Sequence, residues 1–191
     1  KLIQKELENN QIVILQAETG SGKTTQIPKI ALEMGLSKKG KIGCTQPRRI
    51  AALTIADRLR DELKRDDLVS HKIRFIEQSD PNSKIKIMTD GILLQELQRD
   101  PLLLDYQCII LDEAHERSLN IDLLLGMFKR ILKKRKDLKL IITSATLDSE
   151  QFLKFFPKAK LISCDGRSYP VNIEYHHNID DDNDFHDLAV Q

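Results

Sequence analysis

The sequence predicts an α/β domain in which a mostly parallel sheet carries helices on both faces. Short apolar runs of strand length recur along the chain, and stretches with helical periodicity separate them. This alternation is typical of β-α-β units. Two of the runs, 12–15 and 108–111, are followed at once by motifs of phosphate chemistry, AETGSGKT at 17–24 and DEAH at 112–115. Both runs are apolar throughout, as in parallel strands buried on both faces, and ligands bind open sheets of this kind where such strands end.

The elements follow in order along the chain. We expect strands at 12–15, 42–44, 85–88, 108–111, 140–142 and 161–163, with further edge strands at 70–75 and 171–175. We expect helices at 23–34, 50–64, 91–99, 121–134 and 150–155. The step from Asp100 to Pro101 ends the third helix, because a residue before proline is pushed out of helical geometry.

The domain organisation is expected to be simple. Residues 1–177 form one folded domain, and residues 178–191, which contain an acidic run, form a linker with little to bury. The first residue is Lys1 and not Met, so we expect the sequence to be part of a longer protein.

Composition excludes several classes of protein. No apolar stretch approaches the ~20 residues of a membrane span, so we expect no membrane partner. Cys44, Cys108 and Cys164 show no metal-ligand spacing and are interpreted as reduced core thiols of an intracellular, cytoplasmic protein. The net charge of +1 excludes a globally electropositive nucleic-acid binder, so any such contact must be local. The basic run 129–136 closes a helix and suits its dipole.

The first motif predicts a P-loop. Gly20 and Gly22 let backbone N–H groups turn inward and form an anion cradle at the start of a helix. Lys23 would contact the β- and γ-phosphates of ATP or another nucleoside triphosphate, and the Thr24 hydroxyl would bind Mg²⁺. The strict pattern begins with glycine, and this chain has Ala17 there. The nucleotide-binding set is Thr19, Gly20, Ser21, Gly22, Lys23, Thr24 and Thr25.

The second motif supplies the carboxylates for hydrolysis. Asp112 ends a buried strand, where its carboxylate can hold the Mg²⁺ directly or through water. Glu113 can orient and deprotonate the attacking water. We therefore expect Glu113, Asp112 and Lys23 to be the catalytic residues, with Thr24 and Asp112 as metal ligands.

Three further polar segments follow predicted strands. The first is the tripeptide SAT at 144–146. The hydroxyls of Ser144 and Thr146 could hydrogen-bond the loop 112–115 and report the nucleotide state, although a tripeptide of this kind is by itself usually a capping turn. Arg48 and Arg49 open a helix and make a clamp for phosphates of a backbone such as RNA, unless they are merely exposed arginines.

The third of these segments begins at Thr89. This residue could cap the following helix, contact a phosphate, or do both. We assign the neighbouring Asp90, together with Thr89, to the residues expected to bind RNA.

Read together, these segments resemble the first RecA-like domain of DEAH-box ATP-dependent RNA helicases, which are P-loop nucleoside triphosphatases, and most of all the bacterial HrpA-like branch. The resemblance covers roughly residues 11–175. It lies in AETGSGKTTQIPK at 17–29, TQPRRIAA at 45–52, TDGILLQEL at 89–97, DEAHERSLNIDLLLG at 112–126, SAT at 144–146 and GRSYPV at 166–171.

The resemblance implies roles for particular residues. His115, Ser144 and Thr146 would couple hydrolysis to movement. Arg48 and Thr89 would touch the backbone of single-stranded RNA.

The resemblance also implies a base contact and a second domain. Arg58 would stack on the nucleotide base. The partner of this domain would be a second RecA-like domain of the same chain, absent here, whose arginines reach the γ-phosphate. Such an arginine is worth ~10³–10⁵ in rate, so we expect this chain alone to bind nucleotide but hydrolyse it poorly.

Two other classes of protein remain open. One is a related motor that moves on DNA, or remodels without unwinding, which salt-controlled binding of matched RNA and DNA strands would distinguish. The other is a non-enzymatic nucleotide- or RNA-binding module. The intact Lys23, Thr24, Asp112 and Glu113 argue against that module.

Overall fold

The computed structural model describes residues 2–17, 21–145 and 149–164. The expected strand at 171–175 and the expected linker at 178–191 lie outside these residues, as do Thr19, Gly20 and Thr146.

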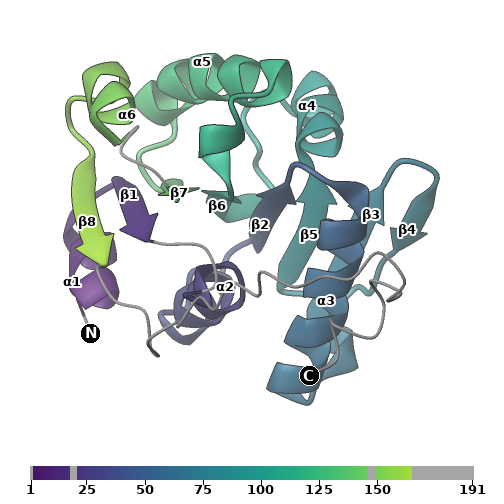
Figure 1. Cartoon of the computed structure of the whole chain (residues 1–191). Coiled ribbons are helices and arrows are strands. Elements are labelled where there is room, and N and C mark those ends of the chain that lie inside the picture. Colours follow the sequence, from purple (N-terminus) through teal and green to yellow (C-terminus); the bar gives the residue numbers. More distant parts are fainter. Residues whose placement is uncertain (1, 18–20, 146–148, 165–191) are drawn as a thin grey trace, which may run out of the picture.

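The described residues form an eight-stranded sheet with helices on both sides (Figure 1). The strands are β1 Ile12–Ala17, β2 Lys41–Gln46, β3 Val69–Ile73, β4 Ile76–Gln78, β5 Ile85–Thr89, β6 Tyr106–Leu111, β7 Lys139–Ser144 and β8 Lys160–Cys164. The helices are α1 Leu2–Asn9, α2 Lys23–Glu33, α3 Arg49–Leu63, α4 Asp90–Arg99, α5 Leu119–Lys134 and α6 Ser149–Phe155, with 3₁₀ turns η1 Asp66–Leu68 and η2 Ala114–Glu116.

Each expected element within the described residues is present, usually a residue or two longer than the apolar run that predicted it. The strand expected at 70–75 is β3 and ends at Ile73, where the chain turns back. Helix α1 and the short strand β4 were not expected from the sequence. Helix α1 has only eight residues with one fully buried side chain, Leu7, and β4 has three residues that are all exposed, so both are short elements with little buried apolar surface.

The sheet separates two apolar cores. Helices α4, α5 and α6 cover one face and α1, α2 and α3 cover the other, as the upper and lower parts of Figure 1 show. Alternate residues of each strand belong to opposite cores. In β6, for example, Ile109 and Leu111 pack with α5, whereas Cys108 and Ile110 pack toward α3. Burial on both faces explains why the central strands are apolar throughout.

The strand order is β4-β3-β5-β2-β6-β7-β1-β8, and all neighbours are parallel except β3 and β4. Therefore β5, β2, β6, β7 and β1 lie side by side and end at the same edge of the sheet. The segments that follow these strands carry all the polar motifs identified in the sequence within the described residues. Among these residues, no helix is long and apolar enough to traverse a bilayer.

Candidate functional site

The start of α2 forms the described part of the predicted P-loop. Gly22 has φ of 78°, a left-handed conformation that favours glycine, and it occupies the N-cap position of α2. Its carbonyl accepts from the backbone N–H groups of Thr25 and Gln26, so the first turn forms directly behind it. The first N–H groups of a helix lack carbonyl partners within it, which makes this end of α2 suited to an anion.

Lys23 connects the P-loop to the carboxylates after β6. Its Nζ lies 3.1 Å from Oε1 of Glu113, and its side chain is only 5% exposed. A buried ammonium requires a negatively charged partner, and in this structure Glu113 provides it. The two motifs, which lie 90 positions apart, are thus brought together at one site, as the strand order requires.

Asp112 is fully buried and its carboxylate is held from both sides. The Thr143 hydroxyl of β7 donates to Oδ1, and Nε2 of Gln46 of β2 donates to Oδ2 over 2.7 Å. Thr143 also accepts from the backbone N–H of Glu113 over 3.2 Å. The neighbouring strands therefore fix the orientation of the carboxylate before any ligand binds.

Glu113 begins a strained turn. Its φ of 53° places a non-glycine residue in the left-handed region, immediately before η2. Such conformations persist where the surroundings enforce them, and they gather at functional sites. Here the turn directs the Glu113 side chain toward Lys23 while Asp112 stays buried.

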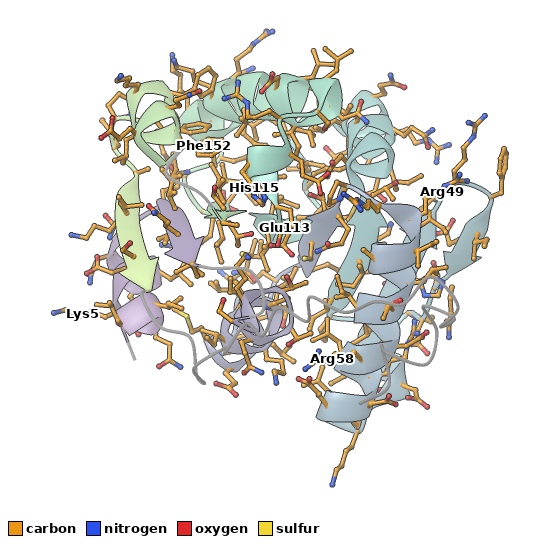
Figure 2. The ribbon with its side chains drawn as sticks, in the orientation of Figure 1. Lys5, Arg49, Arg58, Glu113, His115 and Phe152 are labelled. Carbon is orange, nitrogen blue, oxygen red and sulfur yellow. The ribbon has the colours of Figure 1, made fainter. Side chains whose placement is uncertain are left out.

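His115 connects this turn to the end of β7. Its Nδ1 accepts a hydrogen bond from the backbone N–H of Ala145 over 3.2 Å. The same nitrogen lies 3.4 Å from Oε2 of Glu113, but it cannot also donate to that carboxylate while it accepts from Ala145. Figure 2 shows Glu113 and His115 next to each other near the middle of the molecule.

The other expected residues of this site are placed as follows. Ser21 is exposed beside Gly22, and Thr24 is half-buried in the first turn of α2. Thr25 is buried, and its hydroxyl donates to the Gly22 carbonyl, so its side chain supports the loop from inside. Ser144 is buried at the end of β7, next to the Ala145 N–H that binds His115.

The donor groups fit a magnesium ion that is held mainly by a nucleotide. Among the described residues, no three His, Cys, Asp or Glu side chains gather as a self-sufficient metal site. Mg²⁺ bound to a nucleotide usually takes only one or two protein oxygens and keeps several waters. The Thr24 hydroxyl and the oriented Asp112 carboxylate are suitable oxygens for that arrangement.

The residues assigned to RNA lie beside β2 and β5. The Arg48 side chain is 76% exposed, and its only ion pair among the described residues is a 3.4 Å contact with Glu116. Arg48, Arg49 and Arg74 line an open groove of about 830 Å³ between α3 and the β3–β4 hairpin. Figure 2 shows Arg49 at the start of α3. Three cations around one groove suit a phosphate backbone.

Thr89 and Asp90 lie at the junction of β5 and α4. Thr89 occupies the N-cap position of α4, but within the part of the chain that is described its side chain makes no capping hydrogen bond, contrary to one of its expected roles. Asp90 is 3% exposed, and its Oδ1 has no hydrogen-bond partner among those residues.

Burial raises the pKa of Asp90 to about 6. The nearby Thr45 hydroxyl lowers this pKa, although it does not reach hydrogen-bonding geometry, and the Glu116 and Asp112 carboxylates raise it further.

Arg58 lies apart from the other assigned residues. It is on the exposed side of α3, well below Arg49 in Figure 2. Its Nε donates to Glu62 over 2.9 Å, and Glu62 also pairs with Lys29 of α2. Hydrogen bonds from Lys29 and then Arg58 lower the pKa of Glu62. Arg58 therefore faces the outer side of the α2–α3 junction, and base stacking by this residue stays a prediction.

Sequence reasoning missed two residues of the site. Gln46 lies within TQPRRIAA at 45–52 but was given no role of its own, and Thr143 directly follows the strand expected at 140–142. Both donate to Asp112, Gln46 from 66 positions away and Thr143 from 31. Their polar character at the end of an otherwise apolar run was the available signal.

Known proteins similar to this chain are helicases. The family model of the DEAD/DEAH box helicases matches residues 1–155. The chain is 54% identical over 171 residues to the ATP-dependent RNA helicase HrpA of Escherichia coli strain K12, an alignment that covers 88% of this chain and 13% of that protein. It is 52% identical over 183 residues to the HrpA homolog of Haemophilus influenzae, covering 94% of this chain and 14% of the homolog.

A solved structure agrees with the sequence relatives. The crystal structure of the Escherichia coli DEAH/RHA helicase HrpB superposes with a TM-score of 0.82 at 38% identity, over 89% of this chain and 22% of that one. The sheet described above thus matches the RecA-like fold expected from the sequence. The chain spans only about 13–14% of the length of the two HrpA relatives. From the family match and these similarities, the chain belongs to the DEAD/DEAH box helicase family.

Proposed function

We propose that this chain is the nucleotide-binding half of an ATP-dependent RNA helicase motor. The observation that carries the proposal is the arrangement of Lys23, Asp112 and Glu113 after the ends of β1 and β6, the two strands on either side of β7. Lys23 also opens a helix whose N-terminus suits an anion. The relatives named as ATP-dependent RNA helicases support the choice of nucleotide and nucleic acid.

On the nucleotide side, Lys23 and the first N–H groups of α2 bind the phosphates. Lys23 then leaves Glu113 for the β- and γ-phosphates, and the freed Glu113 carboxylate orients and deprotonates the attacking water. Thr24 and Asp112 hold the Mg²⁺, which supplies charge neutralisation at the phosphates. Thr19, Gly20 and Ser21 complete the loop in this proposal.

On the RNA side, Arg48, Arg49 and Thr89 bind the phosphate backbone of a single strand, with Asp90 behind them. His115, Ser144 and Thr146 couple the two sides, and the bond between Ala145 and His115 supports this role because it joins the carboxylate turn to β7.

The complete site requires a second RecA-like domain in the parent protein. In this proposal its arginines complete the γ-phosphate site from across the domain cleft. The chain alone then binds nucleotide but turns it over slowly, because stabilisation of the charge in the transition state is incomplete.

Nucleotide binding by the chain tests the proposal. We expect a fluorescent ATP analogue to bind in Mg²⁺, and Lys23→Met to weaken binding by at least about tenfold, since one charged hydrogen-bonding group contributes ~1.5–3 kcal/mol. Glu113→Gln should retain binding, because it removes the base and keeps the shape of the side chain. The matched control is Lys5→Met, an exposed lysine of α1 (Figure 2). Equal affinities for the unsubstituted chain and Lys23→Met would contradict the proposal.

A further inference from the structure

We propose that Gln46 is a positioning residue that orients Asp112 toward the magnesium ion. Gln46 also connects this carboxylate to the arginine segment, Arg48 and Arg49, which follows β2. The inference rests on the function proposed above and goes beyond it, because it assigns a role to a side chain outside the phosphate motifs.

The contacts of Asp112 are the first step. The carboxylate is fully buried, and a buried charge needs hydrogen-bond donors that replace the lost water. The described donors are the Thr143 hydroxyl at Oδ1 and the Gln46 amide, 2.7 Å away, at Oδ2. A carboxylate oxygen has two lone pairs, so each oxygen can accept from its donor and still face a cation or its water. The two donors therefore set the plane in which Asp112 presents its free lone pairs.

The position of Gln46 in the chain is the second step. It is the last residue of β2, 2% exposed, and Pro47 follows it. A residue before proline is restricted to extended conformations, so the connection from Gln46 to Arg48 is stiff. Arg48 then takes an extended conformation, at φ −115° and ψ 137°, as the N-cap residue of α3.

The neighbour of Gln46 in β2 is the third step. Thr45 is buried on the opposite side of the strand and lies near Asp90, the first residue of α4. The last two residues of β2 thus contact both sides of the site: Thr45 faces the β5–α4 junction and Gln46 holds Asp112. A ligand that displaces Arg48 moves the amide of Gln46 relative to Asp112.

The test is nucleotide affinity of this chain measured twice, in Mg²⁺ and in a chelator. Gln46→Met keeps the length of the side chain but removes the donor. We expect it to reduce the gain in affinity that Mg²⁺ provides by about tenfold, the lower end of the range for partners of metal ligands, and to leave the affinity in chelator within about twofold. A merely structural role would lower both affinities together or neither.

Two further variants sharpen this measurement. Ile42→Val, in the same strand and buried away from Asp112, is the matched control for a small packing change and should leave both affinities unchanged. Gln46→Leu also removes the donor while it keeps a side chain of similar size, so it should lose the Mg²⁺ gain as well; it also serves if Gln46→Met does not fold. Retention of the full gain by either folded variant would overturn the inference.

The proposed connection from Asp112 through Gln46 to Arg48 and Arg49 is tested in the full-length protein. There, Gln46→Met should lower the fold-stimulation of hydrolysis by single-stranded RNA more than it lowers the rate without RNA. Equal losses would overturn this connection. If the unsubstituted chain shows no Mg²⁺-dependent nucleotide binding, the function proposed above fails; if it binds and the Gln46 variants match it, only this inference fails.

Discussion

Asp90 is a carboxylic acid in a place where its charged form is poorly supported. It is almost fully buried at the start of α4, and its Oδ1 has no partner in the described part of the chain. The dipole of α4 favours a negative charge there, but burial outweighs it, and the pKa rises to about 6. Asp90 therefore gains a proton more readily in the folded chain than in the unfolded one, where its pKa is near 3.8.

This shift predicts a pH dependence of stability. The folded pKa is raised, so protonated Asp90 favours the fold at low pH, and that contribution is lost as the pH rises through about 6. We expect Asp90→Asn to raise the free energy of unfolding by about 2–3 kcal/mol at pH 8, and by about 1 kcal/mol less at pH 5. Urea unfolding of the ligand-free chain at both pH values measures this, with the exposed Asp61→Asn as control. A gain independent of pH would show that the charge of Asp90 is not the cause.

At the scale of elements, Arg135 joins the end of α5 to the loop before β6. Its Nη1 donates to the carbonyls of Leu102 and Leu103, its Nη2 donates to the carbonyl of Tyr106, and the side chain is only 12% exposed. The loop needs this support because Leu103 has φ of 50°, a left-handed conformation that disfavours leucine. Strand β6, which Asp112 follows, begins directly after this loop.

Removal of the guanidinium should therefore destabilise the domain. We expect Arg135→Met to lower the free energy of unfolding by about 2–4 kcal/mol, because part-buried carbonyls lose their donor. The matched control is Lys134→Met, its exposed neighbour at the end of α5, which should change stability by under about 0.5 kcal/mol. Thermal unfolding of the three proteins compares them, and equal midpoints for Arg135→Met and Lys134→Met would argue against this anchoring role.

At the scale of the whole molecule, the order β5-β2-β6-β7-β1 arranges the candidate site as a row. The P-loop follows β1 at one end, the arginine segment and Thr89 follow β2 and β5 at the other, and Asp112 lies between them. Gln46 of β2 and Thr143 of β7, the strands on either side of β6, donate to Asp112, so this carboxylate is held from both sides.

Because this row of strand ends lacks the arginines proposed to come from a second domain, we predict weak nucleotide hydrolysis by the chain alone. We expect slow hydrolysis that single-stranded RNA does not stimulate, and stimulated hydrolysis only in a longer chain that includes the second domain. An arginine from that domain would contribute ~10³–10⁵ in rate. Steady-state phosphate release from both chains, with and without RNA, measures the difference. Brisk RNA-stimulated release from this chain would contradict the prediction.

Local sequence determined the elements and the phosphate motifs, because both depend on residues close together in the chain. The apolar runs at β1 and β6 predict buried parallel strands, and the glycines and Lys23 predict the turn into α2. The fold class could be predicted for the same reason, since the alternation of strand and helix is a local pattern. Helix α1 was not predicted, because it has only eight residues and a single fully buried side chain, Leu7, although its apolar residues do recur at helical spacing.

Only the tertiary structure decided which of these segments touch. The strand order places β2 beside β6 and β6 beside β7, so Gln46 and Thr143 meet Asp112 across long separations in sequence. It also places Lys23 against Glu113 and buries Asp90 without a described partner for Oδ1. Hydrogen bonds and burial of this kind depend on how strands pair across the whole sheet, and pairing between distant strands leaves no mark in the local sequence of either one.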